Sequence, residues 1–526
     1  MATRVQMDGA EEAKRGQTEA PSTQNIMSSS HLEECFRCRF PKLEAKDYAV
    51  SAELPKLLSV LSPTIVSTFF TPEIGEVFWP AFLRGYDKCC KKTPPSLSIN
   101  LLLRLFHEVR KRAEISSNLD FTDNDDKIGG HFSEENICEF LWFCWVMEHN
   151  AKFVHFCDNK MDENSLELPE IKSLVRSAIA AFSGSDLEQL HKEDLNETRM
   201  LDIEIPVQSL FSWILATIPG LAHCLPHYVQ NALQRTSLGS MVAVHTSPQT
   251  EEVCSSAQNV VDSGLLTSGT AWAIALSFKP SLGGEHLMMS FMSVSHSRVL
   301  PDLLYRSSQH GKGMNRFWSQ VSGYNGPILI LISGSSTEEE CDDLLCRRWI
   351  IGAFVNQGFE NMDSFYGSFG CLFAVKPIFR SFLPAGREKN FVYSHLHPLG
   401  RVYEPHPKPV AIAFGGTLGN ERVFLDEDFA KITIRHHVVD KTYHAGYLVP
   451  GQEYSTLEAS VLGVEAWGLG GKVAEQEQTM FKQREQLFTE QRRKVDLKTF
   501  GNWEDSPEKI MMDLVSNPNR VQREDR

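Results

Sequence analysis

Hydrophobic residues change their spacing along this chain, and the change predicts where its parts begin and end. Between about residues 46 and 240 they recur at three- and four-residue intervals, for example in ELPKLLSVLSPTIVSTFF from Glu53 and LSINLLLRLFHEVRKRA from Leu97. That spacing gives each helix one apolar face. The alternating pattern typical of strands is absent from this part of the sequence. We therefore predict an all-α N-terminal domain.

The spacing changes after the polar stretch SPQTEEVCSSAQ, which begins at Ser247. Short apolar segments separated by Gly and Pro follow, which is typical of strands. The run ILILI after Pro327 suits a strand covered on both faces, and NRFWSQV before Gly323 has helical character. Many short antiparallel strands favour two packed sheets over a parallel fold. The strand-like segments include TAWAIALSF, LMMSFMSVS, ILILI, IIGAFV, YGSFGCLFAV, NFVYSHL, PVAIAFGG, RVFLDEDF and VLGVEAWGL.

The predicted fold class is α+β. A helical domain (46–240) is followed by a two-layer antiparallel β-sandwich with flanking helices (250–470, core 290–470), and then by a C-terminal helix and tail (471–526). Residues 1–45 hold few large apolar side chains among many Ser, Thr, Gln, Glu and Ala residues. Such a composition cannot bury enough apolar surface to fold, so we predict a disordered N-terminal tail.

The C-terminal segment from Lys472 to Val495 predicts an amphipathic helix of about six turns. Its apolar residues form two adjacent seven-residue columns among Glu, Gln, Lys, Arg and Thr. The stripe either packs against its own domain or is offered to a partner helix. The first column holds Val473, Met480 and Leu487, and the second holds Ala474, Phe481, Phe488 and Val495.

Composition and charge narrow the function classes. The chain has 52 basic and 67 acidic residues and a formal net charge of −15, which repels phosphate backbones, so nucleic acid is not an expected partner. The N-terminus lacks an apolar signal region, and no run of 18 apolar residues occurs. Position 2 is Ala2, which excludes N-myristoylation at this start. Twelve scattered cysteines are typical of reduced thiols, so we expect a cytoplasmic protein.

One acidic segment, LDFTDNDDKIGGHFSEENI from Leu119, resembles a calcium loop between two helices. Starting at Asp123 puts Glu134 twelfth but places Lys127 and Ile128 where an oxygen ligand and Gly are needed. Starting at Asn124 restores Gly129, but Ile128 then replaces a ligand. Two interpretations stay open: a solvated acidic turn, or a calcium site that would make the chain a calcium-responsive scaffold.

A hydrolase-like site is conceivable around the turn QHGKG, since Ser307, Ser308 and His310 lie near it and acidic residues follow later. The acidic candidates are Asp426, Asp428 and Glu465. The sequence has no Gly-x-Ser-x-Gly nucleophile elbow. The alternative is that these groups stabilise turns and loops. We expect no catalytic residues and assign structural roles to Ser308, His310, Gly311, Gly367, Glu465 and Trp467.

Glu465 is unusual because it interrupts the apolar run VLGVEAWGL. A carboxylate in such a strand is expected to be paired internally, here with Arg306, Arg316 or Arg422. For redox chemistry, Cys341 lies among acidic residues that oppose a thiolate, and Cys371 lies in the apolar run FGCLFAV. We expect neither a metal site nor a cofactor.

Two surfaces are candidate partner-binding sites. The first is the loop from Gly415 and Gly416 to Asp426 and Asp428, where glycines would expose the backbone and acidic groups could meet a basic partner. The second is the apolar stripe of the C-terminal helix. Its candidate contact residues are Met480, Phe481, Leu487 and Phe488. Arg347-Arg348-Trp349 is either a further contact or a capped strand end.

Several sequence blocks resemble a TLDc domain, the module of the oxidation-resistance proteins. They are LLYRSSQHGKG, GYNGPILILIS, IIGAFV, YGSFGCLFAVKPIF, NFVYSH, IAFGGTLGNERVFLDEDF and VEAWGLGG. The helical N-terminal half and the C-terminal helix are similar to the mTOR-associated TLDc branch. The chain departs from the family at Gly313-Met314-Asn315 and at Val423-Phe424. It also begins Met-Ala where that branch can begin Met-Gly.

The resemblance implies a β-sandwich without a catalytic centre. It also implies binding to the vacuolar-type proton pump or to a lysosomal or vacuolar mTOR-type signalling complex, together with a contribution to oxidative-stress resistance. We therefore predict a non-catalytic regulatory protein with protein partners. The alternatives are an oxidative-stress enzyme that uses the first-turn Ser and His residues, and the calcium-responsive scaffold. The expected location is cytoplasmic, with the lysosomal or vacuolar membrane surface and the nucleus as open alternatives.

Overall fold

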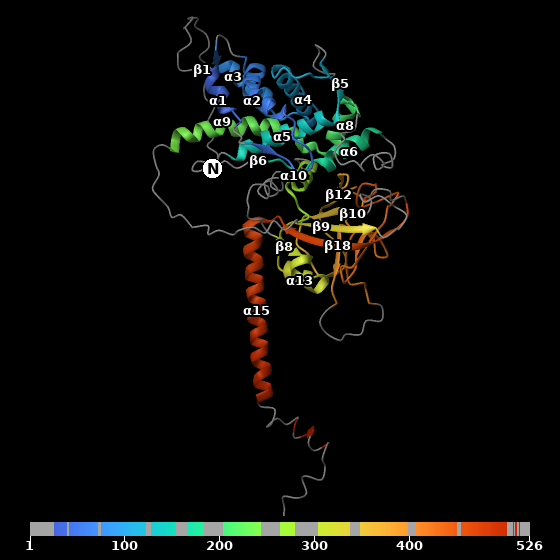
Figure 1. The fold of residues 1–526 in the computed structure, drawn as a ribbon. Helices are drawn as coiled ribbons and strands as arrows, with labels where there is room; N and C mark the ends of the chain where they lie inside the picture. Colours follow the sequence, from blue (N-terminus) through green and yellow to red (C-terminus); the bar gives the residue numbers. More distant parts are fainter. Residues whose placement is uncertain are drawn as a thin grey trace, which may run out of the picture. The chain divides into compact units, whose positions relative to one another are not determined.

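The computed structural model describes most of the chain, in eleven stretches and a few residues near the C-terminus (Figure 1). The chain divides into two compact units. The first comprises Met1–Ile171 and Met200–Asn259, and the second comprises Lys172–Arg199 and Val260–Arg526. The described residues are 26–38, 42–71, 75–121, 128–153, 166–183, 203–242, 264–278, 303–336, 348–397, 407–449 and 454–501, together with 509, 511, 512 and 515.

The first unit is mainly helical, as predicted. Its helices bury the apolar faces that the spacing indicated; α2, for example, buries Leu54, Leu57, Leu58 and Leu61. The middle of α5 is buried on all sides from Phe140 to Met147. The helices are α1 (Ser29–Cys35), α2 (Leu54–Ile65), α3 (Trp79–Cys90), α4 (Pro95–Arg112), α5 (Glu134–Phe153), α8 (Val207–Thr217) and α9 (Cys224–Val242), with short turns η2 (Val66–Phe70) and η3 (Pro219–His223).

Short strands that the sequence analysis did not predict join these helices. The pairs are β1 (Ile26–Ser28) with β3 (Glu76–Phe78), β2 (Leu43–Glu44) with β6 (Leu166–Glu167), and β4 (Leu119–Phe121) with β5 (Ile128–Phe132) and β7 (Ile205–Pro206). β1 and α1 also lie inside the stretch 1–45 that was expected to be disordered. The reason is that α1 and the residue after it bury Leu32, Cys35 and Phe36 in the unit. Residues 1–25 lie outside the described part.

Among the described residues, no single helix is long and apolar enough to cross a membrane. Only α8 taken together with Pro219–Gln234 has the length and composition, and these two segments meet at a bend of 97°.

The described residues of the second unit form an antiparallel sheet, four short helices and the long C-terminal helix. Its helices are α6 (Lys172–Ser183), α10 (Ser268–Ser277), α12 (Ser307–His310), α13 (Met314–Val321) and α15 (Gly471–Gly501). α6 groups with this unit instead of the helical one, and the Phe379 amide donates to the Ser173 carbonyl at 3.0 Å.

The segment TAWAIALSF is a helix, α10, so its prediction as a strand was wrong. Its residues are buried on every side from Gly269 to Ser277, and a continuous apolar run of this length has no period that separates a strand from a buried helix. The Thr267 side chain caps the helix by accepting from the Thr270 amide at 3.2 Å, a local signal for a helix start. The segment LMMSFMSVS lies outside the described residues.

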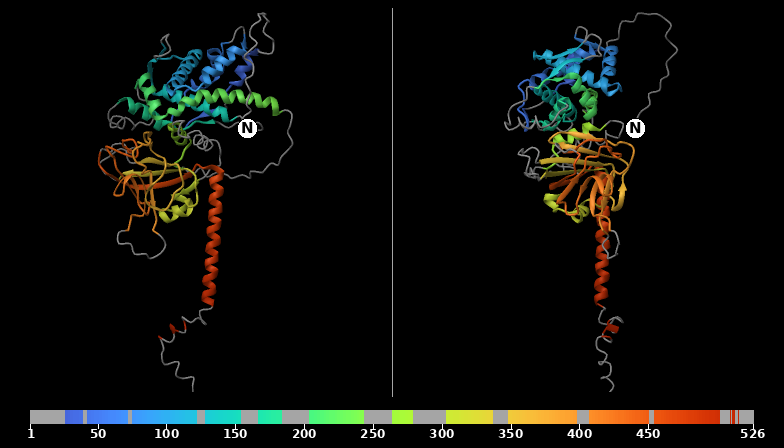
Figure 2. Two further views of the ribbon diagram at one scale, coloured as in Figure 1. Left: turned by 180° about the vertical axis from the view of Figure 1, so that it is seen from behind. Right: turned by 90° about the vertical axis from the view of Figure 1, so that its right-hand side faces the viewer.

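The described strands of the second unit form one curled antiparallel sheet, and the mixed α+β class is confirmed (Figures 1 and 2). The path runs β11-β14-β15-β16-β17-β18-β9-β10-β12-β13, with β8 also paired to β18. The strands are β8 (Leu303–Arg306), β9 (Ile328–Ser336), β10 (Arg348–Val355), β11 (Met362–Tyr366), β12 (Gly370–Lys376), β13 (Arg380–Phe382), β14 (Val392–His395), β15 (Ala411–Thr417), β16 (Asn420–Leu425), β17 (Lys431–Ile434) and β18 (Leu457–Gly468).

The predicted two layers are the two halves of this one sheet. β13 and β16 are far apart in the strand order, yet the Arg422 guanidinium lies 4.7 Å from the centre of the Phe382 ring. One apolar core draws side chains from both halves, including Leu372, Ile412 and Val464. The curl therefore encloses a single core.

A buried ion pair sits where the two halves meet. Arg422 Nη1 lies 2.7 Å from Asp440 Oδ2, and each side chain is 1% exposed. Arg422 also donates to the carbonyls of His444 and Gly446, each at 2.7 Å. Burial lowers the pKa of Arg422, and Asp440 opposes that effect.

Replacing Arg422 by Met should destabilise the sheet by about 3–5 kcal/mol, because it leaves the Asp440 carboxylate buried without its cation. Hydrogen exchange of the full chain, read in peptides from β15 to β17, measures the loss. The matched control is Lys408→Met, which breaks an exposed pair with Asp363 and should cost less than about 1 kcal/mol. Similar losses in the two variants would contradict a buried pair at Arg422.

Candidate functional site

The central strand β18 has a gap along one of its two edges. It pairs with β17 over Leu457–Ser460 and with β8 over Glu465–Trp467, while its other edge pairs with β9. Between the two partners, the Val461 amide donates to the Ala430 carbonyl at 2.9 Å. Lys312 Nζ donates to the Val461 carbonyl at 2.7 Å, and the Val464 amide donates to Ser307 Oγ at 3.0 Å. Neighbouring groups thus satisfy backbone atoms that no strand partner reaches.

The turn that carries these groups has the geometry that its glycines indicated. Gly311 and Gly313 have φ of +83° and +106°, values that favour glycine. The Tyr305 hydroxyl donates to the Gly311 carbonyl at 2.7 Å, and burial raises the pKa of Tyr305 to about 12, which keeps it a neutral donor. The Arg306 amide donates to His310 Nδ1 at 3.0 Å.

Of the three arginines considered for Glu465, Arg306 is its partner. Arg306 Nε lies 2.9 Å from Glu465 Oε1, and the two residues are direct cross-strand neighbours in β8 and β18. Glu465 Oε2 accepts from Trp467 Nε1 at 3.0 Å and from the Leu266 amide at 3.3 Å. The carboxylate is therefore buried with a charge partner and two hydrogen-bond donors.

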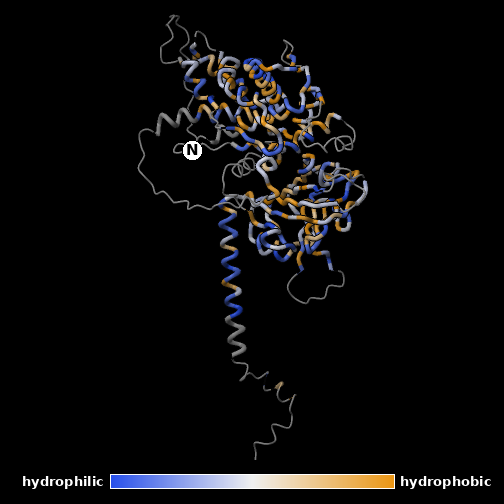
Figure 3. The backbone as a smooth tube through the Cα atoms, viewed as in Figure 1, coloured by the Kyte–Doolittle hydropathy of each residue, from blue (hydrophilic) through white to orange (hydrophobic). Residues whose placement is uncertain are grey.

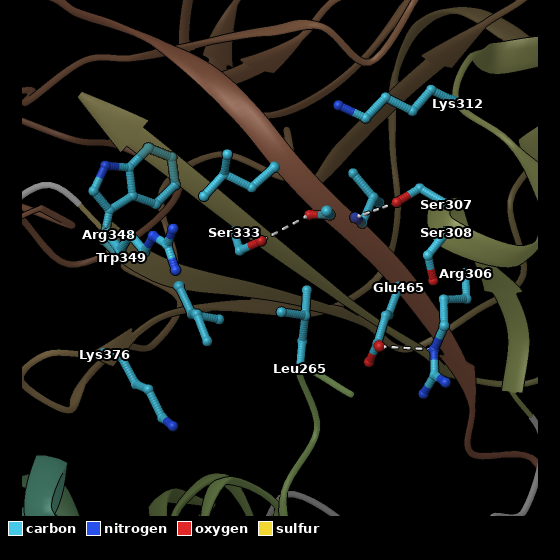
Figure 4. Close-up of a pocket in the computed structure, with 14 residues that line it drawn as sticks. Leu265, Arg306, Ser307, Ser308, Lys312, Ser333, Arg348, Trp349, Lys376 and Glu465 are labelled. Carbon is cyan, nitrogen blue, oxygen red and sulfur yellow. Dashed lines mark hydrogen bonds and ion pairs between the residues drawn. The ribbon is translucent and has the colours of Figure 1, made fainter. Parts of the chain in front are cut away.

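A cavity of about 540 Å³ lies beside this pair. Figure 4 shows Arg348 and Lys376 on one side of it, and Arg306, Ser307 and Ser308 on the other. Its apolar wall includes Leu265, Trp349 and Leu462, and its lining is completed by Lys312, Ser333, Ile350, Gly463, Val464 and Glu465. Four basic side chains and one acidic side chain thus face a single space.

Comparison with known proteins identifies the unit that holds this cavity. Residues 284–470 match the family model of the TLDc domain. This chain contains a TLDc domain. The chain is also similar to oxidation resistance protein 1 of Bos taurus, with 25% identity over 162 residues. That match covers 29% of this chain and 16% of the relative, so the chain spans only a small part of the relative's length. The predicted TLDc resemblance is confirmed.

Most of the residues weighed above for a hydrolase-like site are engaged in other contacts. Ser307 Oγ and His310 Nδ1 each accept a backbone amide, as described above. Asp426 Oδ1 accepts from the Ala430 amide at 2.8 Å and so fixes its own turn. Ser308 is exposed, and its hydroxyl makes no hydrogen bond to another described residue. Asp428 is exposed in the turn between β16 and β17.

The proposed loop from Gly415 to Asp428 is mostly strand. Gly415 and Gly416 lie in β15, just before its last residue Thr417, with φ of +71° and +76°, and Gly415 is buried. A Cβ built on Gly415 would lie 3.0 Å from the Tyr443 ring. Gly415 is thus a packing position and not the exposed backbone that was expected. The exposed tip of this hairpin is Leu418 and Gly419. Gly367 also has a positive φ, +114°, beside Phe391.

The C-terminal helix α15 uses one of its two apolar columns to dock on the TLDc domain. Ala474 is buried, and the Phe481 ring lies against Gly323. Gln478 Nε2 donates to the Gln320 carbonyl at 2.7 Å and to the Ser322 carbonyl at 3.2 Å, and Lys482 Nζ also reaches Gln320 at 3.1 Å. These contacts lie in the first turns of a helix of 31 residues.

The other column of α15, Val473, Met480 and Leu487, stays exposed, and Phe488 of the docking column is exposed beyond the docked turns. The exposed fractions are 68% for Val473, 51% for Met480, 60% for Leu487 and 64% for Phe488. Figure 3 shows the described part of α15 as a largely hydrophilic helix interrupted by short apolar bands. Met480, together with Phe481, also lines a hollow of about 580 Å³ at the junction with α13. Packing on the domain therefore accounts for one part of the stripe, and the exposed part stays a candidate for contact with a partner helix.

Other candidate chemistry is limited. Cys371 is buried, and burial raises the pKa of its thiol, which opposes a reactive thiolate. In the described part of the chain no cluster of three or more His, Cys, Asp or Glu side chains could hold a metal ion. The tip of the acidic loop, 122–127, and the cysteines Cys341 and Cys346 lie outside the described residues. Glu134, the twelfth position of one calcium register, accepts from the Tyr48 hydroxyl at 2.8 Å.

Sequence reasoning missed the cavity. Lys312, Arg348 and Lys376 come from a turn and two strands, and the pairing of β12 with β10, β10 with β9 and β9 with β18 places them around one space. A sequence signal existed only for Arg348, as part of a short basic segment before a strand.

Replacing Gly415 by Ala should destabilise the TLDc domain more than replacing Gly419 by Ala. Both residues have a positive φ, +71° and +85°, which costs an L-residue about 1–2 kcal/mol. Gly415 adds a forced shift of the Tyr443 ring, worth about 1–3 kcal/mol more, whereas nothing lies within 4 Å of a Cβ at Gly419. Calorimetric unfolding of the full chain measures both. Equal losses would show that Gly415 belongs to an open loop.

Proposed function

We propose that this protein is a non-catalytic TLDc interaction protein. Its partner is the vacuolar-type proton pump or an mTOR-type signalling complex at the lysosome or vacuole, and it contributes to resistance against oxidative stress. The protein acts from the cytoplasm, with peripheral attachment to the lysosomal or vacuolar surface through its partner.

The exposed column of α15 is the observation that carries this proposal. Met480, Leu487 and Phe488 are each more than half exposed. Met480 and Leu487 lie seven residues apart on one side of the helix, and Phe488 lies in the adjacent column. An amphipathic helix that presents a row of apolar anchors is a common means of binding a groove in a partner protein. After Lys482, which makes the last contact described above, the helix continues to Gly501 for about 28 Å at 1.5 Å per residue.

The partner class rests on similarity. The TLDc domain relates residues 284–470 to a family whose members are associated with the proton pump and with lysosomal signalling, as the sequence blocks implied. The matched relative carries oxidation resistance in its name. A role in oxidative-stress resistance is therefore part of the proposal.

The contacts of the first turn support a non-catalytic role. A serine nucleophile needs a base within hydrogen-bond reach. His310 Nδ1 instead accepts the Arg306 amide, and Glu465 is engaged by Arg306 and Trp467. These polar groups therefore stabilise the strand gap.

The triple variant Met480→Glu, Leu487→Glu and Phe488→Glu should reduce capture of proton-pump subunits from cell extract by tenfold or more. Buried apolar anchors each contribute a large share of binding energy, and a carboxylate at each position would be desolvated in the interface. Quantitative mass spectrometry of material retained by the full-length chain measures the change.

The matched control is Gln476→Glu, Gln483→Glu and Gln486→Glu. It adds the same three negative charges to exposed polar positions of α15, and capture should stay within about twofold of the unchanged chain. If both triple variants lose capture equally, charge and not the apolar column is responsible. If the unchanged chain captures no subunits of the pump or of an mTOR-type complex, the proposed partners are wrong.

Replacing Ser308 by Ala should leave cell survival under hydrogen peroxide unchanged. The side chain is exposed, and the strand gap does not depend on it. An oxidative-stress enzyme with Ser308 as its nucleophile requires the opposite result. Loss of protection, with the variant protein present at its normal level, would support catalysis.

A further inference from the structure

We propose that the cavity beside β18 binds a small organic anion, one that joins a carboxylate or phosphate group to an apolar body. The cavity lies on a different surface from the exposed column of α15. Its ligand therefore goes beyond the proposed partner binding, and the two can be tested separately.

The charge of the lining is the first reason. The whole chain has a net charge of −15, yet Arg306, Lys312, Arg348 and Lys376 line this cavity together with one acid, Glu465. Arg306 neutralises Glu465 at 2.9 Å. The other charged side chains of the lining are basic, and among them Lys312 and Arg348 give the cavity an attraction for anions despite the overall sign of the protein.

The placement of the individual cations is the second reason. Lys312 Nζ is held by the Val461 carbonyl at 2.7 Å, a neutral group that leaves its charge uncompensated. Arg348 is exposed at the start of β10. Its guanidinium can form the paired hydrogen bonds that suit carboxylate and phosphate oxygens. Figure 4 shows Lys376 on the same side of the cavity as Arg348.

Neutral donors complete the polar side. Ser307 Oγ accepts from the Val464 amide at 3.0 Å, which leaves its own hydrogen available to donate. Ser308 is exposed beside it and lines the same cavity. Hydroxyl donors next to cations are typical of sites for oxygen-rich anions.

The apolar wall indicates that the ligand is more than a bare ion. Leu462 occupies an irregular point in the pairing of β18 with β9 and is 48% exposed. Leu265, Trp349 and Ile350 add further apolar surface. A space of about 540 Å³ is within the range of small-molecule sites, which are mostly apolar with a few polar groups that fix orientation. Inorganic phosphate would leave that wall without contact.

The test uses 8-anilinonaphthalene-1-sulfonate, an aromatic anion whose fluorescence rises on binding, with the full-length chain. Saturable binding at one site is expected. The double variant Arg348→Ala and Lys376→Ala should weaken it about tenfold or more, because two cations are lost. The control Arg387→Ala and Lys389→Ala removes two exposed cations outside the cavity and should change the affinity less than twofold.

A second variant covers the case in which the double variant fails to fold. Leu462→Glu puts a carboxylate on the cavity wall and should weaken binding severalfold, whereas Leu418→Glu, at a comparably exposed Leu on the β15–β16 hairpin, should not. Binding that is unsaturable, or equally affected by variants and controls, overturns the proposal.

Displacement of the bound dye then identifies the ligand chemistry. Phenylbutanoate and phenyl phosphate should each displace it, and their ratio separates a carboxylate from a phosphate ligand. Uncharged phenylbutanol and inorganic phosphate should be at least tenfold weaker. Equal displacement by phenylbutanol would show a plain apolar pocket, and equal displacement by inorganic phosphate a bare anion site. Displacement by an acidic peptide alone would show a peptide groove, and each of these three results overturns the proposal.

Discussion

The TLDc domain depends on one strand, β18, which pairs with three others. β9 covers one edge, while β17 and β8 share the other edge and leave a gap between them. A backbone group left unpaired in a protein interior is costly, so the gap has to be filled. The turn 307–312 supplies a serine hydroxyl and a lysine ammonium for this purpose. The position of that turn, and hence of the cavity beside it, follows from the pairing of β17 and β8 with different parts of the same edge of β18.

In the described part of the domain, two ion pairs with both side chains buried accompany this arrangement. Arg306 and Glu465 face each other across β8 and β18, and Arg422 and Asp440 lie where the halves of the sheet meet. A buried pair contributes little net stability, but separating its members is expensive. A shifted register would separate Arg306 from Glu465. We infer that this pair selects the register of β8 more than it strengthens the domain.

The sequence predicted those features that depend on local pattern. The helical period identified the first unit and α15, the glycines of QHGKG identified a positive-φ turn, and the isolation of Glu465 in an apolar run indicated a charged partner. The predictions were wrong where one local pattern is compatible with two structures. TAWAIALSF has no period that separates a strand from a buried helix. The pair Gly415-Gly416 looks the same in sequence whether it lies in an exposed loop or packs against the Tyr443 ring. The cavity was not predictable, since the elements carrying Lys312, Arg348 and Lys376 meet only through the order in which β18, β9, β10 and β12 pair, which no local pattern indicates.

The attachment of α15 to the domain determines what the exposed column can do. Gln478 and Lys482 donate to carbonyls at the C-terminal end of α13, where a helix has no internal donors for its last carbonyls. A lysine there also complements the negative end of the helix dipole. One helix therefore caps another, and this fixes the direction in which α15 leaves the domain. A helix held in this way loses less conformational freedom when it binds a partner protein. The polar contacts of the first turns of α15 therefore favour binding of a partner by the apolar residues farther along the helix.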